Sequence, residues 1–261
     1  NRTGVRVVSD YDLDSGPDPA TVAAADPETL DGDADPVHAV GIGPGNLDYL
    51  TPRGRRAIED ADVVVGFETV VDFIAEETDA DLLTCGYKDE REALTTFADR
   101  VASGERGTAV LMGDPNHSGY QFVGKVQDVV DRPVRVIPGI SSLQIAASRA
   151  RTPMEDTEFV TLHKSGDISD DLQRLTATVG DRHLLVLPRP FDWMPGDIAA
   201  HLLEAGADYG FDALVLEKLT HDGESISRFS LGDLADHAGG SGADSTPFSD
   251  LSVLAVRREV T

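Results

Sequence analysis

The fold is decided by the stretch VHAVGIGPGN at Val37–Asn46. Its apolar first half predicts a buried strand, and the three glycines and the proline that follow predict a loop. Glycine has no Cβ and accepts positive φ, so the backbone of this loop can come close to a ligand. The order of apolar strand, loop and amphipathic helix then recurs along the chain. This order predicts an α/β protein with parallel strands covered on both faces.

We expect five parallel strands in the first half and a mixed sheet in the second half, where the alternating residues 224–229 predict an antiparallel strand. The expected division is an N-terminal extension at 1–36, an N-terminal α/β domain at 37–150 and a C-terminal α/β domain at 151–261. The extension is acidic and has few large apolar residues, so most of it should be disordered, and we assign it no catalytic role.

The composition excludes several classes of function. The formal net charge is −25, which argues against nucleic-acid binding, and the four lysines against 47 acidic residues favour a halophilic protein. Cys85 is the single cysteine, and no histidine pair has metal-ligand spacing, so we expect no disulfide and no metal site. With no apolar run of about 18 residues and no signal-peptide pattern, we expect a cytoplasmic protein without membrane contact.

Three loops are candidates for ligand binding. The first only half fits a dinucleotide fingerprint, because the helix expected at Thr51 starts too far beyond Gly43. Asp114 follows an apolar strand, where its carboxylate can accept a hydrogen bond from a ribose hydroxyl or an ammonium group; the alternative is an Asp-Pro turn closed on its own backbone. Ser141 and Ser142 stand at a helix start, where they can cap the helix or help to hold a carboxylate.

The motifs around these loops, VGIGPG at 40–45, GDP at 113–115 and PGISSLQ at 138–144, resemble those of the tetrapyrrole methylases. The resemblance covers residues 37–257 and implies that family's two-domain α/β fold, with S-adenosylmethionine in the cleft between the two sheets. VIPGISSLQ at 136–144 and FVTLH at 159–163 are most similar to members that methylate C5 of the corrinoid cobalt-precorrin-7 in cobalamin biosynthesis. Alternatives are another activity of the family, on a different ring carbon or on a protein as in diphthine synthase, or a non-catalytic ligand-binding α/β protein.

The resemblance also implies roles for single residues. Cofactor contacts, mostly through the backbone, are implied for Pro44, Asp114, His117, Ser141, Ser142, Leu187 and Leu219. No general base is certain, although His163 is a candidate proton acceptor. Such a substrate carries several carboxylates, and we expect Lys88, Lys164, Arg189 and Lys218, which stand at or near predicted strand ends, to bind them; the alternative is ordinary surface pairing.

The family likeness finally implies partners. We expect a homodimer acting on a corrinoid small molecule. Some relatives carry a second methyltransferase, acting at C15, fused at the C-terminus. Because this chain ends at Thr261, we expect the C15-methyltransferase/decarboxylase activity in a separate protein of the same pathway.

Overall fold

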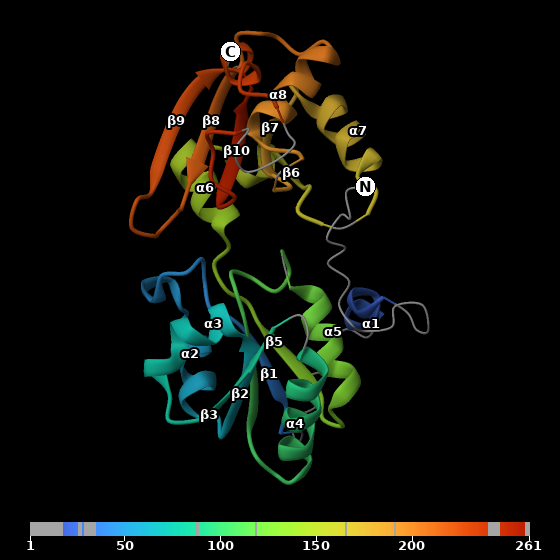
Figure 1. Cartoon of the computed structure of the whole chain (residues 1–261), viewed down its shortest axis with the longest axis vertical. Helices are drawn as coiled ribbons and strands as arrows, with labels where there is room; N and C mark the ends of the chain where they lie inside the picture. The colour runs from blue at the N-terminus through green and yellow to red at the C-terminus, as the bar shows by residue number, and fades with distance from the viewer. Residues whose placement is uncertain are drawn as a thin grey trace, which may run out of the picture. The chain divides into compact units, whose positions relative to one another are not determined.

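The computed structural model describes residues 18–25, 28, 35–86, 89–117, 119–164, 166–190, 192–239 and 246–258. The chain divides into two compact units, Asn1–Ser141 and Ser142–Thr261, each built on its own five-stranded sheet (Figure 1). No described helix combines the length and the apolar character needed to cross a membrane.

The first unit holds an all-parallel sheet in the order β3-β2-β4-β1-β5. Its strands are β1 (Val37–Gly41), β2 (Val63–Phe67), β3 (Asp81–Cys85), β4 (Gly107–Leu111) and β5 (Val134–Ile137). The helices are α2 (Pro52–Glu59), α3 (Glu68–Ile74), α4 (Glu90–Ala102) and α5 (Tyr120–Val129), with short 3-10 turns at Leu47–Tyr49 and Ala75–Glu77. The expected five-stranded parallel sheet is therefore confirmed.

Each face of this sheet has its own core. Apolar residues of α4 and α5, such as Phe97 and Phe122, pack on one face. Residues of α2 and α3, such as Ile58 and Ile74, pack with the other face. Thr51 caps α2 as predicted, because its hydroxyl accepts the Gly54 N–H at 3.1 Å and Pro52 takes the first helical position.

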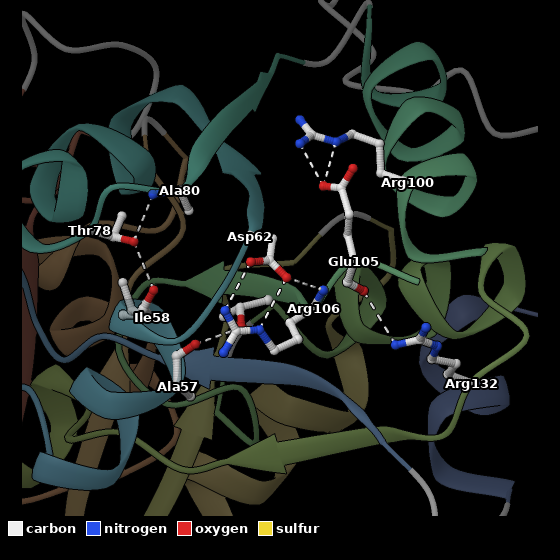
Figure 2. A network of polar contacts seen from close by, with 10 residues as sticks. Ala57, Ile58, Asp62, Thr78, Ala80, Arg100, Glu105, Arg106 and Arg132 are labelled. Atoms are coloured by element: carbon white, nitrogen blue, oxygen red, sulfur yellow. Dashed lines mark hydrogen bonds and ion pairs between the residues drawn. The ribbon is translucent and has the colours of Figure 1, made fainter. Parts of the chain in front are cut away.

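Polar contacts join the strands at the amino edge of the sheet (Figure 2). Asp62, just before β2, accepts bonds from the backbone N–H and the guanidinium of Arg106, just before β4. These bonds, from the side chain first and then the backbone, lower the pKa of Asp62 to about 2. Arg100 bridges Glu105 and Asp81 nearby. These contacts give the amino edge of the sheet a structural role.

The N-terminal extension differs from its expectation in one part. Residues Pro19–Ala25 form a helix, α1, which packs on α5. The contact is close: a Cβ on Gly124 would collide with the carbonyl oxygen of Pro19. The disorder expected for most of residues 1–36 thus does not extend to this helix, because a short Ala-rich segment can dock where a glycine opens a neighbouring helix. Residues 1–17, 26–27 and 29–34 lie outside the described part.

The second unit holds a mixed sheet in the order β6-β7-β10-β8-β9, as predicted. The strands are β6 (Thr157–Thr161), β7 (His183–Leu187), β8 (Asp212–Glu217), β9 (Ser225–Ser230) and β10 (Ser252–Arg257). The helices are α6 (Ser142–Ala150), α7 (Ser169–Thr178), α8 (Pro195–Glu204) and α9 (Leu231–Ala235), with a 3-10 turn at Met154–Asp156. β6 and β7 are parallel, β10 runs antiparallel to β7 and β8, and β9 runs antiparallel to β8.

The division between the units lies earlier in the chain than expected. The helix α6, placed by sequence at the end of a domain 37–150, belongs to the second unit, where it packs against β7 and β10. The sequence could not show this, because an apolar helix face fits the sheet before it as well as the sheet after it.

Candidate functional site

The loops that follow β1, β4 and β5 meet at the carboxyl edge of the first sheet. They meet because β1 lies between β4 and β5 in a parallel sheet. Gly43 and Gly113 exchange two backbone hydrogen bonds, from Gly113 N to Gly43 O at 2.7 Å and from Gly43 N to Gly113 O at 3.2 Å. We call Gly41, Gly43, Gly113 and Gly139, with the loops that carry them, the glycine junction.

The junction has no room for side chains at two of its glycines. A Cβ on Gly41 would lie 2.5 Å from the carbonyl oxygen of Gly113 and 2.7 Å from the amide nitrogen of Gly139. A Cβ on Gly139 would collide with the carbonyl oxygens of Gly113 and Gly41. The three loops are therefore packed backbone against backbone, which makes peptide groups the main functional groups of this edge.

Asp114 lies in the junction with 8% of its surface exposed. Its Oδ1 accepts bonds from the backbone N–H of Asn116 at 3.0 Å and from Nδ2 of Asn116 at 2.8 Å. Its Oδ2 lies 4.0 Å from Nδ1 of His117. The carboxylate of Asp114 thus closes a turn on its own loop, as the alternative prediction had it, and its Oδ1 is already hydrogen-bonded. Within the described residues, Oδ2 is the oxygen that remains for a ligand.

The other predicted cofactor residues of the first unit lie in the same loops. Pro44 is buried directly after Gly43, and Ser141 is buried with its Cα 3.7 Å from the position of a Cβ on Gly113. Ser142, which is half-buried, begins α6 and so opens the second unit. Pro44, Asp114, His117 and Ser141 are therefore brought together by this unit alone.

The second sheet gathers the remaining predicted residues at one of its edges. β7 and β8 both run antiparallel to β10, and β6 runs parallel to β7, so the carboxyl ends of β6, β7 and β8 share an edge. This edge carries His163 and Lys164 after β6, Leu187 and Arg189 at and after β7, and Lys218 and Leu219 after β8. His163 is exposed, and its backbone N–H donates to Oγ1 of Thr161 at 3.2 Å.

Two of the predicted substrate cations already have partners. Nζ of Lys164 lies 2.5 Å from Oδ2 of the nearly buried Asp171. Arg189 contacts both oxygens of Asp192 at 2.8 Å and donates to the carbonyl oxygen of Gly166 at 3.1 Å. Lys218 is exposed and lines a shallow polar depression with Glu217, Ser225 and Ser249. Lys88 lies outside the described residues.

Sequence reasoning missed the backbone of the β8–β9 turn, residues 218–224. Lys218 and Thr220 have left-handed φ values of 49° and 70°. The side chain of Glu224 accepts the Thr220 N–H at 2.7 Å and bonds Arg149 of α6 at 2.8 Å. Neither lysine nor threonine favours the left-handed region strongly enough for the sequence to predict these two conformations. Among the described residues, no group of three or more His, Cys, Asp or Glu side chains is placed to hold a metal ion.

Several known proteins resemble this chain in sequence or in fold. The probable cobalt-precorrin-7 C(5)-methyltransferase of Methanocaldococcus jannaschii is 28% identical over 201 residues, which are 77% of this chain and 92% of that protein. A solved structure of a cobalt precorrin-4 methyltransferase covers 88% of this chain and 98% of its own, with a TM-score of 0.67 and 21% identity.

A second solved structure, the uroporphyrin-III C-methyl transferase of Thermus thermophilus complexed with S-adenyl homocysteine, covers 85% of this chain and 92% of its own, with a TM-score of 0.61 and 19% identity. These structures confirm the α/β fold. The family model of the Tetrapyrrole (Corrin/Porphyrin) Methylases matches residues 36–235. The chain belongs to this family of methyltransferases.

Proposed function

We propose that this protein is an S-adenosylmethionine-dependent C-methyltransferase that methylates C5 of cobalt-precorrin-7 in cobalamin biosynthesis. The observation that carries the proposal is the likeness to the probable C(5)-methyltransferase, which extends over 92% of that relative. In the PGISSLQ motif, which carries part of the sequence resemblance to the family, the glycine completes the junction and the first serine lies beside Gly113.

The glycine junction fits the cofactor by the chemistry of its groups. S-adenosylmethionine supplies, when bound, a methyl group on a sulfonium centre, which is a good leaving group. Oδ2 of Asp114 can accept a hydrogen bond from a ribose hydroxyl or from the ammonium group, since the local turn occupies only Oδ1. Pro44, His117 and Ser141 can then complete the contacts at the junction. Ser142, Leu187 and Leu219 belong to the other unit and remain contacts that the family likeness implies.

The residues of the chain mainly have to hold and orient the two reactants. A fixed approach geometry and the exclusion of water can supply roughly 7–11 kcal/mol of a barrier. The packed backbone of the junction is suited to this role because its loops cannot shift without breaking the Gly43–Gly113 bonds. His163 is exposed at the edge of the second sheet, where it is our candidate for accepting a proton.

Substrate carboxylates need a local positive charge on a protein of net charge −25. Lys218 is the described cation best suited to this, because Lys164 and Arg189 each have a carboxylate partner within the chain. For these two, binding a substrate carboxylate requires an exchange of partner.

The test is methyl transfer by the purified chain. Mass spectrometry should show the gain of one methyl group by cobalt-precorrin-7 and the formation of S-adenosylhomocysteine. The likeness to a cobalt precorrin-4 methyltransferase makes cobalt-precorrin-4 the second candidate substrate. It is therefore offered as the competing substrate in the assay. Methylation of cobalt-precorrin-4 alone would make that compound the substrate in place of cobalt-precorrin-7. Binding of S-adenosylhomocysteine without methylation of either compound would contradict the assignment to this step.

A further inference from the structure

The β8–β9 turn holds an unusual backbone conformation. Only three non-glycine residues of the described chain have positive φ, and two of them, Lys218 and Thr220, stand on either side of Leu219. Threonine is β-branched and rarely enters the left-handed region. Residues in such conformations persist only where the surrounding structure imposes them, and they concentrate at sites that bind ligands.

The side chain of Glu224 imposes the conformation. Its Oε2 accepts the N–H of Thr220 at 2.7 Å, and its Oε1 accepts Nε of Arg149 at 2.8 Å. The bond from Arg149, followed by that from Thr220, holds the pKa of Glu224 below its ordinary value, so the carboxylate stays ionised. Arg149 lies in the last turn of α6, so the pair fastens the turn to a helix that packs on the same sheet.

Leu219 lies between the two strained residues with its side chain buried and 5% of its surface exposed. Within the described part of the chain, neither its amide N–H nor its carbonyl oxygen takes part in a hydrogen bond. Buried peptide groups are almost always paired, so a fixed and unpaired peptide at the ligand edge of a sheet has the character of a binding group.

We propose that Arg149 and Glu224 are positioning residues, which hold the β8–β9 turn so that the peptide groups of Leu219 are presented to S-adenosylmethionine. The proposal rests on the proposed function, in which Leu219 is a cofactor contact. Neither side chain needs to touch the cofactor. Their effect passes through Thr220, whose N–H is the direct partner of Glu224.

The experiment measures S-adenosylhomocysteine binding to the full chain by calorimetry, with Glu224→Gln and Arg149→Gln as variants. We expect each to weaken binding by about tenfold, as for a binding group displaced by part of an ångström. The double variant should lose no more than either single one, because the two residues act as a unit. Arg228→Gln is the matched control, since it removes an exposed ion pair with Asp212 at the other end of the same hairpin.

Two further readouts separate positioning from a general loss of structure. The KM for S-adenosylmethionine should rise while kcat at saturating cofactor stays near that of the wild type. Adding Thr220→Asn to Glu224→Gln should restore part of the affinity, because asparagine enters the left-handed region more readily.

The outcomes are distinguishable. Wild-type binding together with variants that bind as tightly as Arg228→Gln would overturn the positioning role and leave the proposed function standing. A wild-type chain that binds no S-adenosylhomocysteine would overturn the proposed function itself. Should Glu224→Gln fail to fold, Arg149→Gln tests the same contact from a partly exposed position on α6.

Discussion

Replacing Gly41 by alanine tests whether the glycine junction is the cofactor site. The new Cβ would lie 2.5 Å from the oxygen of Gly113, 2.7 Å from the nitrogen of Gly139 and 2.7 Å from Cδ of Pro115. Two of these atoms belong to the backbone and cannot rotate away. Because ordinary contact begins near 3.4 Å, the loops after β4 and β5 must move by about 1 Å.

The size of the effect follows from this displacement. Overpacking of a close-packed site costs about 1–3 kcal/mol. The shift also strains the two Gly43–Gly113 hydrogen bonds, each worth about 0.5–1.5 kcal/mol. A destabilisation of roughly 2–4 kcal/mol lowers Tm by on the order of 5–15 °C in a protein of this size. A misplacement of about 1 Å can also lower the rate of an enzyme by up to about 100-fold. We therefore expect the affinity for S-adenosylhomocysteine to fall at least about tenfold.

The assay pairs calorimetry with thermal unfolding and uses Gly86→Ala as the control. Gly86 follows β3 at the same edge of the same sheet, has no positive φ, and would place its Cβ at an ordinary 3.5 Å from Asp89. The control should keep both Tm and affinity. If Gly41→Ala matched the control in both measurements, the packed junction would not be the cofactor site.

Four further predictions concern other parts of the molecule. Tm should rise markedly from about 0.1 M toward about 2 M KCl, because a net charge of −25 repels itself across a Debye length near 10 Å; a flat response would remove the halophile hypothesis. Deleting residues 1–34 should lower Tm by stripping α1 from α5 while S-adenosylhomocysteine affinity holds, and an unchanged Tm would show that α1 adds nothing. Burial lowers the pKa of His183. The residue therefore contributes stability that is fully present above its unfolded pKa of about 6.5 and is lost as pH falls through its native pKa. His183→Asn, whose oxygen can replace Nδ1 as acceptor for the Arg258 N–H, should flatten Tm between about pH 5 and 7, and an unchanged slope would contradict this. Lys218→Gln should raise KM for the corrinoid several-fold at low salt. Lys164→Gln should instead lower Tm, because the buried Asp171 is then left with the longer contact to Arg174 at 3.9 Å, and the reverse pattern would return the substrate role to Lys164.

The sequence was sufficient for both sheets because their strands follow simple patterns. β2 is a continuous apolar run, and β1 and β4 are nearly so, interrupted only by His38 and Thr108, as expected of parallel strands buried on both faces. All three lie in the expected sheet. The alternation in residues 224–229 predicted an antiparallel strand, and β9 (Ser225–Ser230) is that strand at the edge of the second sheet. In β1, β2 and β4 the pattern records which side chains are buried, whereas in β9 the apolar Ile226 is exposed and Phe229 is partly buried.

The sequence did not predict conformations that depend on contacts between elements far apart in the chain. Helix α1 has a short, weakly apolar sequence, and its place on α5 depends on the missing Cβ of Gly124, more than a hundred residues away in the chain. The β8–β9 turn is likewise fastened through Glu224 to Arg149, 75 residues away in the chain. Local propensity contains neither contact, since each arises from groups brought together by the finished fold.

The cations show the same limit within the candidate site. Their sequence positions after strands correctly placed Lys164, Arg189 and Lys218 at one edge of the second sheet. Position after a strand does not fix a side-chain partner, and the folded chain pairs Lys164 with Asp171 and Arg189 with Asp192. An approaching carboxylate must displace these partners. Asp171 is nearly buried, so the loss of Lys164, its nearer counter-ion, is costly even though Arg174 remains at 3.9 Å. Exposed Lys218 meets no such cost, and attraction of an anionic substrate should therefore depend on it more than on the other two.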